Sequence, residues 1–475
     1  MTELVSVLND YLWAKLLVIL LVAIGLFLTV YLGFIQFKFF PEMVRLLGDG
    51  RNRDKSKKTV SSLQAFMIGM AARIGTGNIA GVATAVALGG PGAVFWMWLM
   101  ALIGSASAFV ESTLAQLYKV KDGSSWRGGP AYYMEKALGN RKLGVIFSIL
   151  ITLSFGLIFN AVQANTIAAS INNEFGVNTK TTAIVLAIIT ALIIFGGVHS
   201  VAKFSTVLVP IKAGVYIILA LWVMISNFDI LPDVFGAIFS EGIFTFKQMF
   251  GGVMGAAVLH GIRRGLFSNE AGMGSAPNAA ATADVTHPVK QGFIQALGVI
   301  VDTFIICSST AMIVLVSGVY KTSELSGIPL TQESLRVSLG DFAATFVSIS
   351  VFLFALSTIM GNYYYGESNI SFMKHSKKSI YIYRFAVIGM VLFGALYSAE
   401  LIWSLADIFM GLMVLVNLYA ITRLAKVVKA LLKDYISQKK QGLDPIFYAD
   451  KIDNLPGREH IEAWVDDKEA NKQIG

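Results

Sequence analysis

The sequence is poor in charged residues. Asp, Glu, Lys and Arg make up 14% of its 475 residues, whereas hydrophobic residues make up 55%. Soluble domains carry about 25% charged residues, so the composition argues against a soluble domain and indicates a protein that crosses a membrane many times. The net charge of +8 then indicates basic cytoplasmic loops rather than a nucleic-acid partner.

Cysteine and histidine are scarce as well. The single cysteine, Cys307, excludes a disulfide framework and a cysteine-based metal site. The five histidines show no HExxH pair or other ligand spacing, which argues against a metalloenzyme. The first apolar run follows Glu3 and Asp10 without a basic segment or a small-residue cleavage site, so we expect no cleaved signal peptide.

Long apolar runs are abundant. A transmembrane helix needs about 20 consecutive apolar residues, and we expect eleven spans. They lie near residues 12–37, 62–86, 92–118, 143–171, 182–198, 201–226, 244–264, 289–318, 342–362, 380–398 and 401–422. The loops after the first, third, ninth and eleventh spans are rich in Lys and Arg, so the positive-inside rule predicts an external N-terminus and a cytoplasmic C-terminus.

The second expected span contains a segment that breaks a helix. Residues 71–81 read AARIGTGNIAG, with three glycines and the polar residues Thr76 and Asn78. Unpaired backbone at membrane depth is tolerated only where it is buried in protein or lines a cavity. Secondary transporters use broken helices of this kind to bind a small charged solute and its ion, so the segment predicts a transporter.

The ten spans after the first divide into two halves of five. The leading span of each half is rich in glycine, with Gly75 and Gly77 in one and Gly251, Gly252 and Gly255 in the other. Paired broken helices of this kind indicate inverted repeats around a midplane site, although the same glycines also suit close helix packing. The expected organisation is an extra helix with a basic loop (1–61), a first repeat (62–226), a second repeat (242–422) and a cytoplasmic tail (423–475).

Four stretches carry a resemblance to a known family: IGTGNIAGVATA from Ile74, GGPGAVFWMW from Gly89, GGPAYYME from Gly128 and RGLFSNEAGMGSAPNAAA from Arg264. With VQAN from Val162 and HPVKQG from His287, they resemble the alanine or glycine:cation symporter family (sodium:alanine symporters) of the amino acid-polyamine-cation superfamily. The likeness spreads over nearly all of residues 10–425. It implies an all-α polytopic membrane protein with eleven helices and a leucine-transporter-type five-plus-five core.

The resemblance also implies a substrate site at the first break. Backbone amides at Gly75, Thr76 and Gly77 would bind the carboxylate of an amino acid, because a helix N-terminus favours an anion, and the Asn78 side chain would be linked to the ion. Gln163 is a further substrate candidate on the fourth span. It and the nearby Asn165 are equally consistent with interhelical hydrogen bonds. Met254, from the second glycine-rich segment, is the candidate for closing the pocket.

A sodium site is implied beside it. The carbonyls of Ala71 and Ile74 would face the hydroxyls of Ser357 and Thr358 on the ninth span, with the Phe354 carbonyl one turn earlier. Oxygen-only ligands suit a hard cation. The alternative is that the two hydroxyls only bond to carbonyls of their own helix.

Other polar residues are candidates for gating or coupling. In the SNEAG segment, which contains Asn269, Glu270 is expected to pair with Arg263 or Arg264 as an inner gate, or else to cap a short interfacial helix. Arg73 needs a partner at membrane depth, for which Glu111 and Asp302 are candidates. Lys212 would either replace Na⁺ in proton coupling or be a structural lysine. Asn362 stands where many family members carry tryptophan, which bears on substrate choice.

The expected function is Na⁺-coupled symport of a small neutral amino acid, alanine or glycine, by alternating access in a bacterial or archaeal plasma membrane. Proton coupling and a preference for glutamine or serine are alternatives within the class. A channel is the alternative from another class, but no span carries a filter-like ring or charge stripe. No nucleophile, base or metal constellation indicates an enzyme, and neither nucleic acid nor an obligate protein partner is expected.

Overall fold

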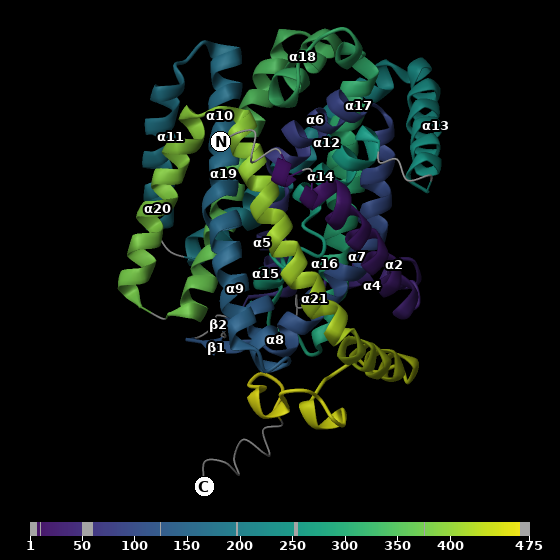
Figure 1. Cartoon of the computed structure of the whole chain (residues 1–475), viewed down its shortest axis with the longest axis vertical. Helices are drawn as coiled ribbons and strands as arrows, with labels where there is room; N and C mark the ends of the chain where they lie inside the picture. The colour runs from purple at the N-terminus through teal and green to yellow at the C-terminus, as the bar shows by residue number, and fades with distance from the viewer. Residues whose placement is uncertain are drawn as a thin grey trace.

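The computed structural model describes residues 7–9, 11–49, 60–123, 125–195, 198–250, 255–374 and 376–465. Almost all of this chain is helical (Figure 1). Within the described residues, the strands β1 (Val120–Asp122) and β2 (Ser125–Arg127) form one antiparallel hairpin, in which Val120 pairs with Arg127. The expected all-α polytopic architecture is confirmed.

Seven helices in the described part of the chain are long and apolar enough to cross a membrane. An eighth is counted if α12 (Val198–Ser226) and α13 (Leu231–Phe250), which are bent by 80° relative to each other, form one span. The seven are Val7–Tyr31 (π-helical turn η1, then α2), α7 (Gly92–Leu117), Arg141–Phe175 (α9, η3 and α10), Pro288–Ser317 (α16, η5 and α17), α19 (Asp341–Met373), α20 (Lys377–Leu396) and α21 (Ala399–Lys440). Two shorter apolar helices, Gly77–Gly89 and α11 (Thr179–Ile194), also coincide with expected spans. The count of eleven and the division into two repeats remain predictions.

Local signals in the sequence place several helix ends. Ser61 and Gln64 form a capping box that begins α5 (Ser62–Arg73). Pro288 stands in the first turn of α16 (Pro288–Val301), and the His287 side chain accepts a hydrogen bond from Val289 N there. Gly176 adopts a left-handed conformation and ends α10 (Asn160–Phe175).

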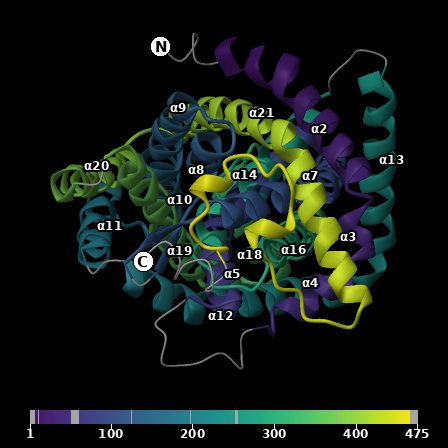
Figure 2. The same cartoon turned by 90° about the horizontal axis from the view of Figure 1, so that it is seen from below.

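Helices on two opposite sides of the molecule enclose a central group of helices. Figures 1 and 2 show α11 and α20 on one side of the molecule, next to α10 and α19, whereas α2 and α13 (Leu231–Phe250) lie on the opposite side. Between them, α14 (Ala256–Asn269) and α16 both pack along α7, and α5 packs against α19 and α12 (Val198–Ser226). The chain segments that follow α5 and α14 therefore lie inside the helical bundle.

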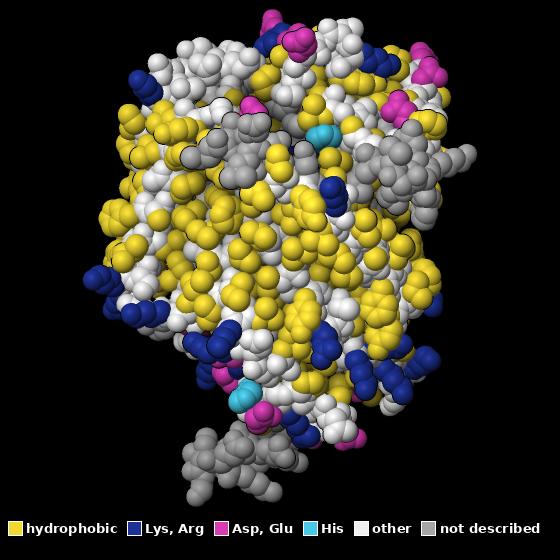
Figure 3. Space-filling model, viewed as in Figure 1, with side chains coloured by type: hydrophobic (Ala, Val, Ile, Leu, Met, Phe, Trp, Pro, Cys, Tyr) yellow, Lys and Arg dark blue, Asp and Glu magenta, His cyan; other side chains and the backbone are white. Residues whose placement is uncertain are grey.

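The surface divides by polarity in the way a membrane protein requires. A broad apolar band crosses the face shown in Figure 3, and Lys and Arg side chains gather at the lower end of that face. Large side chains within the band face outward: Leu192 is 75% exposed and Phe385 65%. Such exposure is expected of side chains in contact with lipid.

The C-terminal segment folds back under the bundle (Figure 2). The helix α21 continues to Lys440, well beyond the expected end of the last span at residue 422. Further on, Trp464 Nε1 donates to Gln116 O at 3.0 Å, and Pro456 O accepts from Tyr118 Oη at 2.6 Å. Residues 443–465 therefore cover the lower end of α7 rather than forming a loose appendage.

Candidate functional site

The first break lies where the sequence predicts it. The helix α5 ends at Arg73, Ile74 leaves the helical conformation with ψ 85°, and the chain resumes as a π-helical turn, η2 (Gly77–Gly81), that leads into α6 (Val82–Gly89). Thr76 and Asn78 are fully buried. Polar backbone is thus exposed to a protein interior at the expected position.

Side-chain oxygens accept hydrogen bonds from the backbone amides of this break. Gly75 N donates to Asn78 Oδ1 at 2.9 Å, and Thr76 N donates to Gln163 Oε1 at 3.1 Å. Residue 75 must be glycine in this arrangement, because a Cβ there would overlap the Thr358 hydroxyl. The structure therefore brings Gln163 to the break, as predicted. The neighbouring Asn165 instead donates to Gly394 O and Tyr397 O, which ties α10 to the end of α20.

The residues expected to bind sodium also come together. The Thr358 hydroxyl lies 2.9 Å from Ala71 O, 3.3 Å from Ile74 O and 3.1 Å from Phe354 O. Ser357 donates to Phe354 O at 2.8 Å. A hydroxyl has one proton, so it satisfies one carbonyl at a time. The Thr358 hydroxyl therefore lies within hydrogen-bonding distance of more carbonyl oxygens than its single proton can serve.

The prediction of a break at Gly251–Gly255 stays a prediction. Residues 251–254, including Met254, lie outside the described residues, and Gly255 directly precedes α14. A further irregular segment lies at residues 270–276, between the end of α14 and α15 (Pro277–Ala280), and we call it the second break. Glu270, Gly272 and Gly274 all adopt positive φ there. Two glycines spaced within SNEAGMGS therefore make its turns.

Buried side chains hold this second break. Glu111 on α7 accepts from Gly274 N at 3.0 Å, from Gly272 N at 3.4 Å and from Asn417 Nδ2 at 2.7 Å. Asn417 also donates to Gly272 O and accepts from the Tyr133 hydroxyl. Every one of these side chains is fully buried. The segment is therefore bonded from two neighbouring helices.

Asp302, which the sequence suggested only as a partner of Arg73, links the segments that adjoin the two breaks. Its Oδ1 accepts from Asn78 Nδ2 at 2.7 Å, and its Oδ2 accepts from the Ser268 hydroxyl at 2.8 Å. Next to it, Asn269 donates to Thr303 Oγ1 at 3.0 Å. A carboxylate inside an apolar run marks a functional site by default, so this signal was present in the sequence.

Arg73 pairs with neither expected carboxylate. Its Nη1 donates to Gln295 Oε1 at 3.2 Å, while Nε and Nη2 have no partner among the described residues. Glu111, Glu270 and Asp302 lie within electrostatic reach of its guanidinium. The expectation of a direct ion pair was therefore wrong, and the charge is balanced at longer range.

The expected pairing of Glu270 with Arg263 or Arg264 was also wrong. Both arginines contact Asp407 Oδ2 on α21, at 3.4 and 2.6 Å, and Glu270 accepts from the Ser275 hydroxyl at 2.6 Å. Arg264 lies beside Gly81, which ends the π-helical turn after the first break. Asp407, like Asp302, is a carboxylate inside an apolar run, but its pairing with Arg264, 143 residues away, had no signal in the sequence.

Aromatic rings separate the first break from the region around Arg264. Phe267 lies against Gly77, where a Cβ would be 2.9 Å from its ring. It stacks on Phe159 with centroids 4.4 Å apart and contacts Trp403 at 4.7 Å. These three rings close the break on that side.

Two further residues have separate outcomes. Lys212 lies within α12, and its side chain is outside the described part of the structure, so its role remains a prediction. Asn362, one helical turn after Thr358 on α19, is fully buried, and neither polar atom of its amide has a partner among the described residues. The described residues contain no group of three or more His, Cys, Asp or Glu placed to bind a metal ion.

Comparisons with known proteins show the family of the chain. The sequence matches the model of the sodium:alanine symporter family over residues 1–449. It is 54% identical over 467 residues to the amino-acid carrier protein AlsT of Bacillus subtilis (98% of each chain) and 53% identical over 476 residues to the probable sodium/glutamine symporter GlnT of that species (99% and 98%). It is 38% identical over 435 residues to the sodium/alanine symporter AgcS of Methanococcus maripaludis (90% and 95%). Among solved structures, Mhp1, a nucleobase-cation-symport-1 family transporter, aligns with a TM-score of 0.48 at 12% identity, over 81% of this chain and 80% of that chain.

Proposed function

The chain belongs to the sodium:alanine symporter family of multi-pass membrane transporters, and from that premise we propose that it moves a small neutral amino acid together with Na⁺ by alternating access. The family accounts for an amino-acid substrate and for coupling to a cation. The specific substrate and ion, and the residues that bind them, are our proposal.

One observation carries the sodium proposal: three carbonyl oxygens converge on the Thr358 hydroxyl. In the bound state, Na⁺ would be coordinated by the carbonyls of Ala71, Ile74 and Phe354 and by the hydroxyls of Ser357 and Thr358, which lie together. All five ligands are neutral oxygens, which suit a hard cation. Since Ala71 lies in the last turn of α5, Ile74 directly follows that helix and the other three belong to α19, binding would fasten the end of α5 to α19.

The substrate carboxylate would take the place of Gln163 at the first break. The Thr76 amide now donates to Gln163 Oε1, and a carboxylate oxygen makes a stronger, charge-assisted bond to the same amide. Gly75, Gly77 and Asn78 complete the proposed substrate site. Because Ile74 and Thr76 are near neighbours, sodium and carboxylate would bind side by side and stabilise each other.

Substrate size depends on what lines the rest of the pocket. The unpartnered Asn362 amide lies on the helix turn next to Thr358, where it would face the substrate side chain. An amide there favours a polar side chain such as that of glutamine over a methyl group, because it would otherwise stay unpaired. Alanine or glycine is the family's general expectation, and glutamine or serine is the alternative that this residue favours.

Proton coupling is the second candidate. It is favoured by Asp302, a fully buried carboxylate hydrogen-bonded to both breaks, where loss or gain of a proton would loosen or fasten them. Lys212 remains a further candidate for this role.

The proposed orientation places the C-terminal segment in the cytoplasm and the N-terminus outside. The Lys and Arg side chains at the lower end of the apolar band support it (Figure 3). The aromatic rings of Phe159, Phe267 and Trp403 would then form the outer gate.

Uptake into proteoliposomes tests the function. Labelled alanine and glutamine should accumulate when Na⁺ is high outside, and collapse of the sodium gradient should abolish accumulation. A proton-coupled carrier would instead accumulate substrate in response to an imposed pH gradient without Na⁺. A channel would equilibrate solute without accumulation, which would overturn the proposal.

A further inference from the structure

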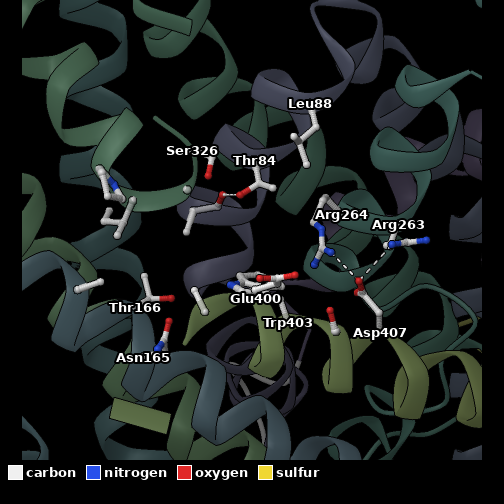
Figure 4. Close-up of a pocket in the computed structure, with 17 residues that line it drawn as sticks. Thr84, Leu88, Asn165, Thr166, Arg263, Arg264, Ser326, Glu400, Trp403 and Asp407 are labelled. Carbon is white, nitrogen blue, oxygen red and sulfur yellow. Dashed lines mark hydrogen bonds and ion pairs between the residues drawn. The ribbon is translucent and has the colours of Figure 1, made fainter. Parts of the chain in front are cut away.

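A cavity lies next to the first break. Its volume is about 470 Å³, within the range of roughly 300–1,000 Å³ that is typical of small-molecule sites. Ala80 of η2 and Thr84 and Leu88 of α6 line one side of it, and α10, α14, residues 326–329 and the beginning of α21 line the rest (Figure 4). We call this cavity the vestibule. In the proposed orientation it opens toward the outside.

The vestibule is distinct from the proposed transport site. Phe267 and Trp403 stand between the two, since Phe267 packs on Gly77 and Trp403 lines the vestibule. None of Gly75, Thr76 and Asn78 lines it. A molecule bound there would therefore wait outside the closed aromatic gate.

Arg264 reaches the vestibule with donors that nothing uses. The residue is 5% exposed, and its Nη2 bonds to Asp407 Oδ2 at 2.6 Å. Its Nε and Nη1 have no partner among the described residues, and neither has Asp407 Oδ1. Trp403 stacks on the guanidinium at 4.5 Å from the ring centroid, which fixes its plane.

Unused buried guanidinium donors point to an anionic ligand. A buried N–H group without a partner costs about 1–3 kcal/mol, and a carboxylate fits a guanidinium with two parallel hydrogen bonds. Asp407 accepts from one hydrogen of Nη2, so a second carboxylate would bind across the unpaired Nη1 and the other hydrogen of Nη2. The tryptophan ring beneath supports a flat, two-bond complex of this kind.

The rest of the lining suits a molecule that also carries a positive charge. Glu400 lines the same cavity in the first turn of α21, and its side chain is exposed. Thr84 and Thr166 add neutral polar groups. We propose that the vestibule binds an amino-acid zwitterion, with its carboxylate on Arg264 and its ammonium group toward Glu400.

This inference rests on the proposed function for the class of ligand. It adds a loading site, from which the amino acid moves to the first break when Phe267 and Trp403 separate. Two amino acids would then bind to one protein at saturation, whereas transport needs only the inner one.

Equilibrium binding of labelled alanine and glutamine to purified protein in lipid nanodiscs, at saturating Na⁺, tests the proposal. The wild type should bind two molecules per chain. Arg264→Lys keeps the charge but loses the two-bond geometry. Glu400→Gln changes only an exposed side chain, so we expect the variant to fold. Each should weaken one site by about tenfold or more and leave the other unchanged. Lys321→Gln, an exposed basic residue in the turn Val319–Lys321, is the matched control and should bind two.

Gly75→Ala separates the two sites, because its Cβ overlaps the Thr358 hydroxyl at the break and lies outside the vestibule. It should retain one molecule, which Glu400→Gln then removes. A wild type that binds a single molecule, lost in Gly75→Ala and unaffected by the Arg264 and Glu400 variants, would overturn the vestibule site and leave the proposed function standing. A wild type that binds no amino acid at all would overturn both.

Discussion

The two breaks in the bundle are built in opposite ways. At the first, residues 74–76 rely on short-range or single contacts: the Asn78 side chain, one oxygen of Gln163 and the hydroxyl of Thr358. At the second, residues 270–276 are bonded by Glu111 and Asn417, which also bond to each other.

The difference indicates a division of labour. Each contact at the first break is made by a neutral group that a ligand carboxylate or cation can replace with a stronger partner. The second break has a carboxylate already in place, so no anion can take its amides without displacing a buried charge. We therefore assign ligand binding to the first break and a supporting role to the second.

Glu111→Ala should break the comparison most severely. It leaves the amides of Gly272 and Gly274 without an acceptor and removes one of the two acceptors of the Asn417 amide, and each such loss costs about 1–3 kcal/mol. We expect a loss of stability on the order of 5 kcal/mol, seen as a large fall in Tm in detergent. Glu111→Gln keeps an acceptor oxygen and should lose less. Equal Tm for wild type and Glu111→Ala would contradict the supporting role.

Thr358→Val should affect function rather than folding. It removes one of five proposed sodium ligands, and a hydrogen bond or ligand to a charged group is worth about 1.5–3 kcal/mol. The sodium concentration for half-maximal uptake should therefore rise by about 10- to 100-fold, while Thr358→Ser stays near the wild type. If uptake by Thr358→Val keeps the wild-type sodium dependence, the assignment of the ion site fails.

Asn362→Trp should change substrate preference. The larger ring would fill the space in which we expect a longer substrate side chain, so the ratio of kcat/KM for glutamine over alanine should fall by about tenfold. Asn362→Ala, which opens the same space, is the control and should still accept glutamine. Unchanged ratios in both variants would show that the residue lies away from the substrate.

Gln163→Leu should have the smallest effect. The empty protein would then hold an unpaired Thr76 amide, at a cost of about 1–3 kcal/mol, which bound substrate would relieve. The rise in Tm on adding substrate should therefore be larger than for the wild type by a few degrees. Asn165→Leu removes a structural amide on the same helix and should lower Tm without changing the substrate-induced rise. The account is weakened if both variants respond to substrate alike.

The sequence predicts the first break well, because local features carry the signal. Glycine and polar residues inside an apolar run mark the break at Ile74–Asn78, whereas Ser357 and Thr358 were named only through the family resemblance. The irregular segment at residues 270–276 was not anticipated, because no local pattern distinguishes its positive-φ glycines, Gly272 and Gly274, from the glycines at 251–255.

Partners far apart in the chain were beyond such reasoning. The bond between Glu111 and Asn417 joins residues 306 positions apart, and Arg264 reaches Asp407 across 143 positions. These pairings depend on how whole helices pack, which no local pattern encodes. Asp302 is different, because its charge inside an apolar run was visible and only its bonds to Asn78 and Ser268 were not.

An experimental structure of the protein with Na⁺ and its amino acid tests the central claim most directly, through the distance between Thr76 N and Gln163 Oε1. That distance is 3.1 Å here. We predict that it opens beyond hydrogen-bonding length and that a substrate carboxylate oxygen takes the place of Gln163. An amino acid bound elsewhere, with the Thr76–Gln163 bond intact, would contradict the account.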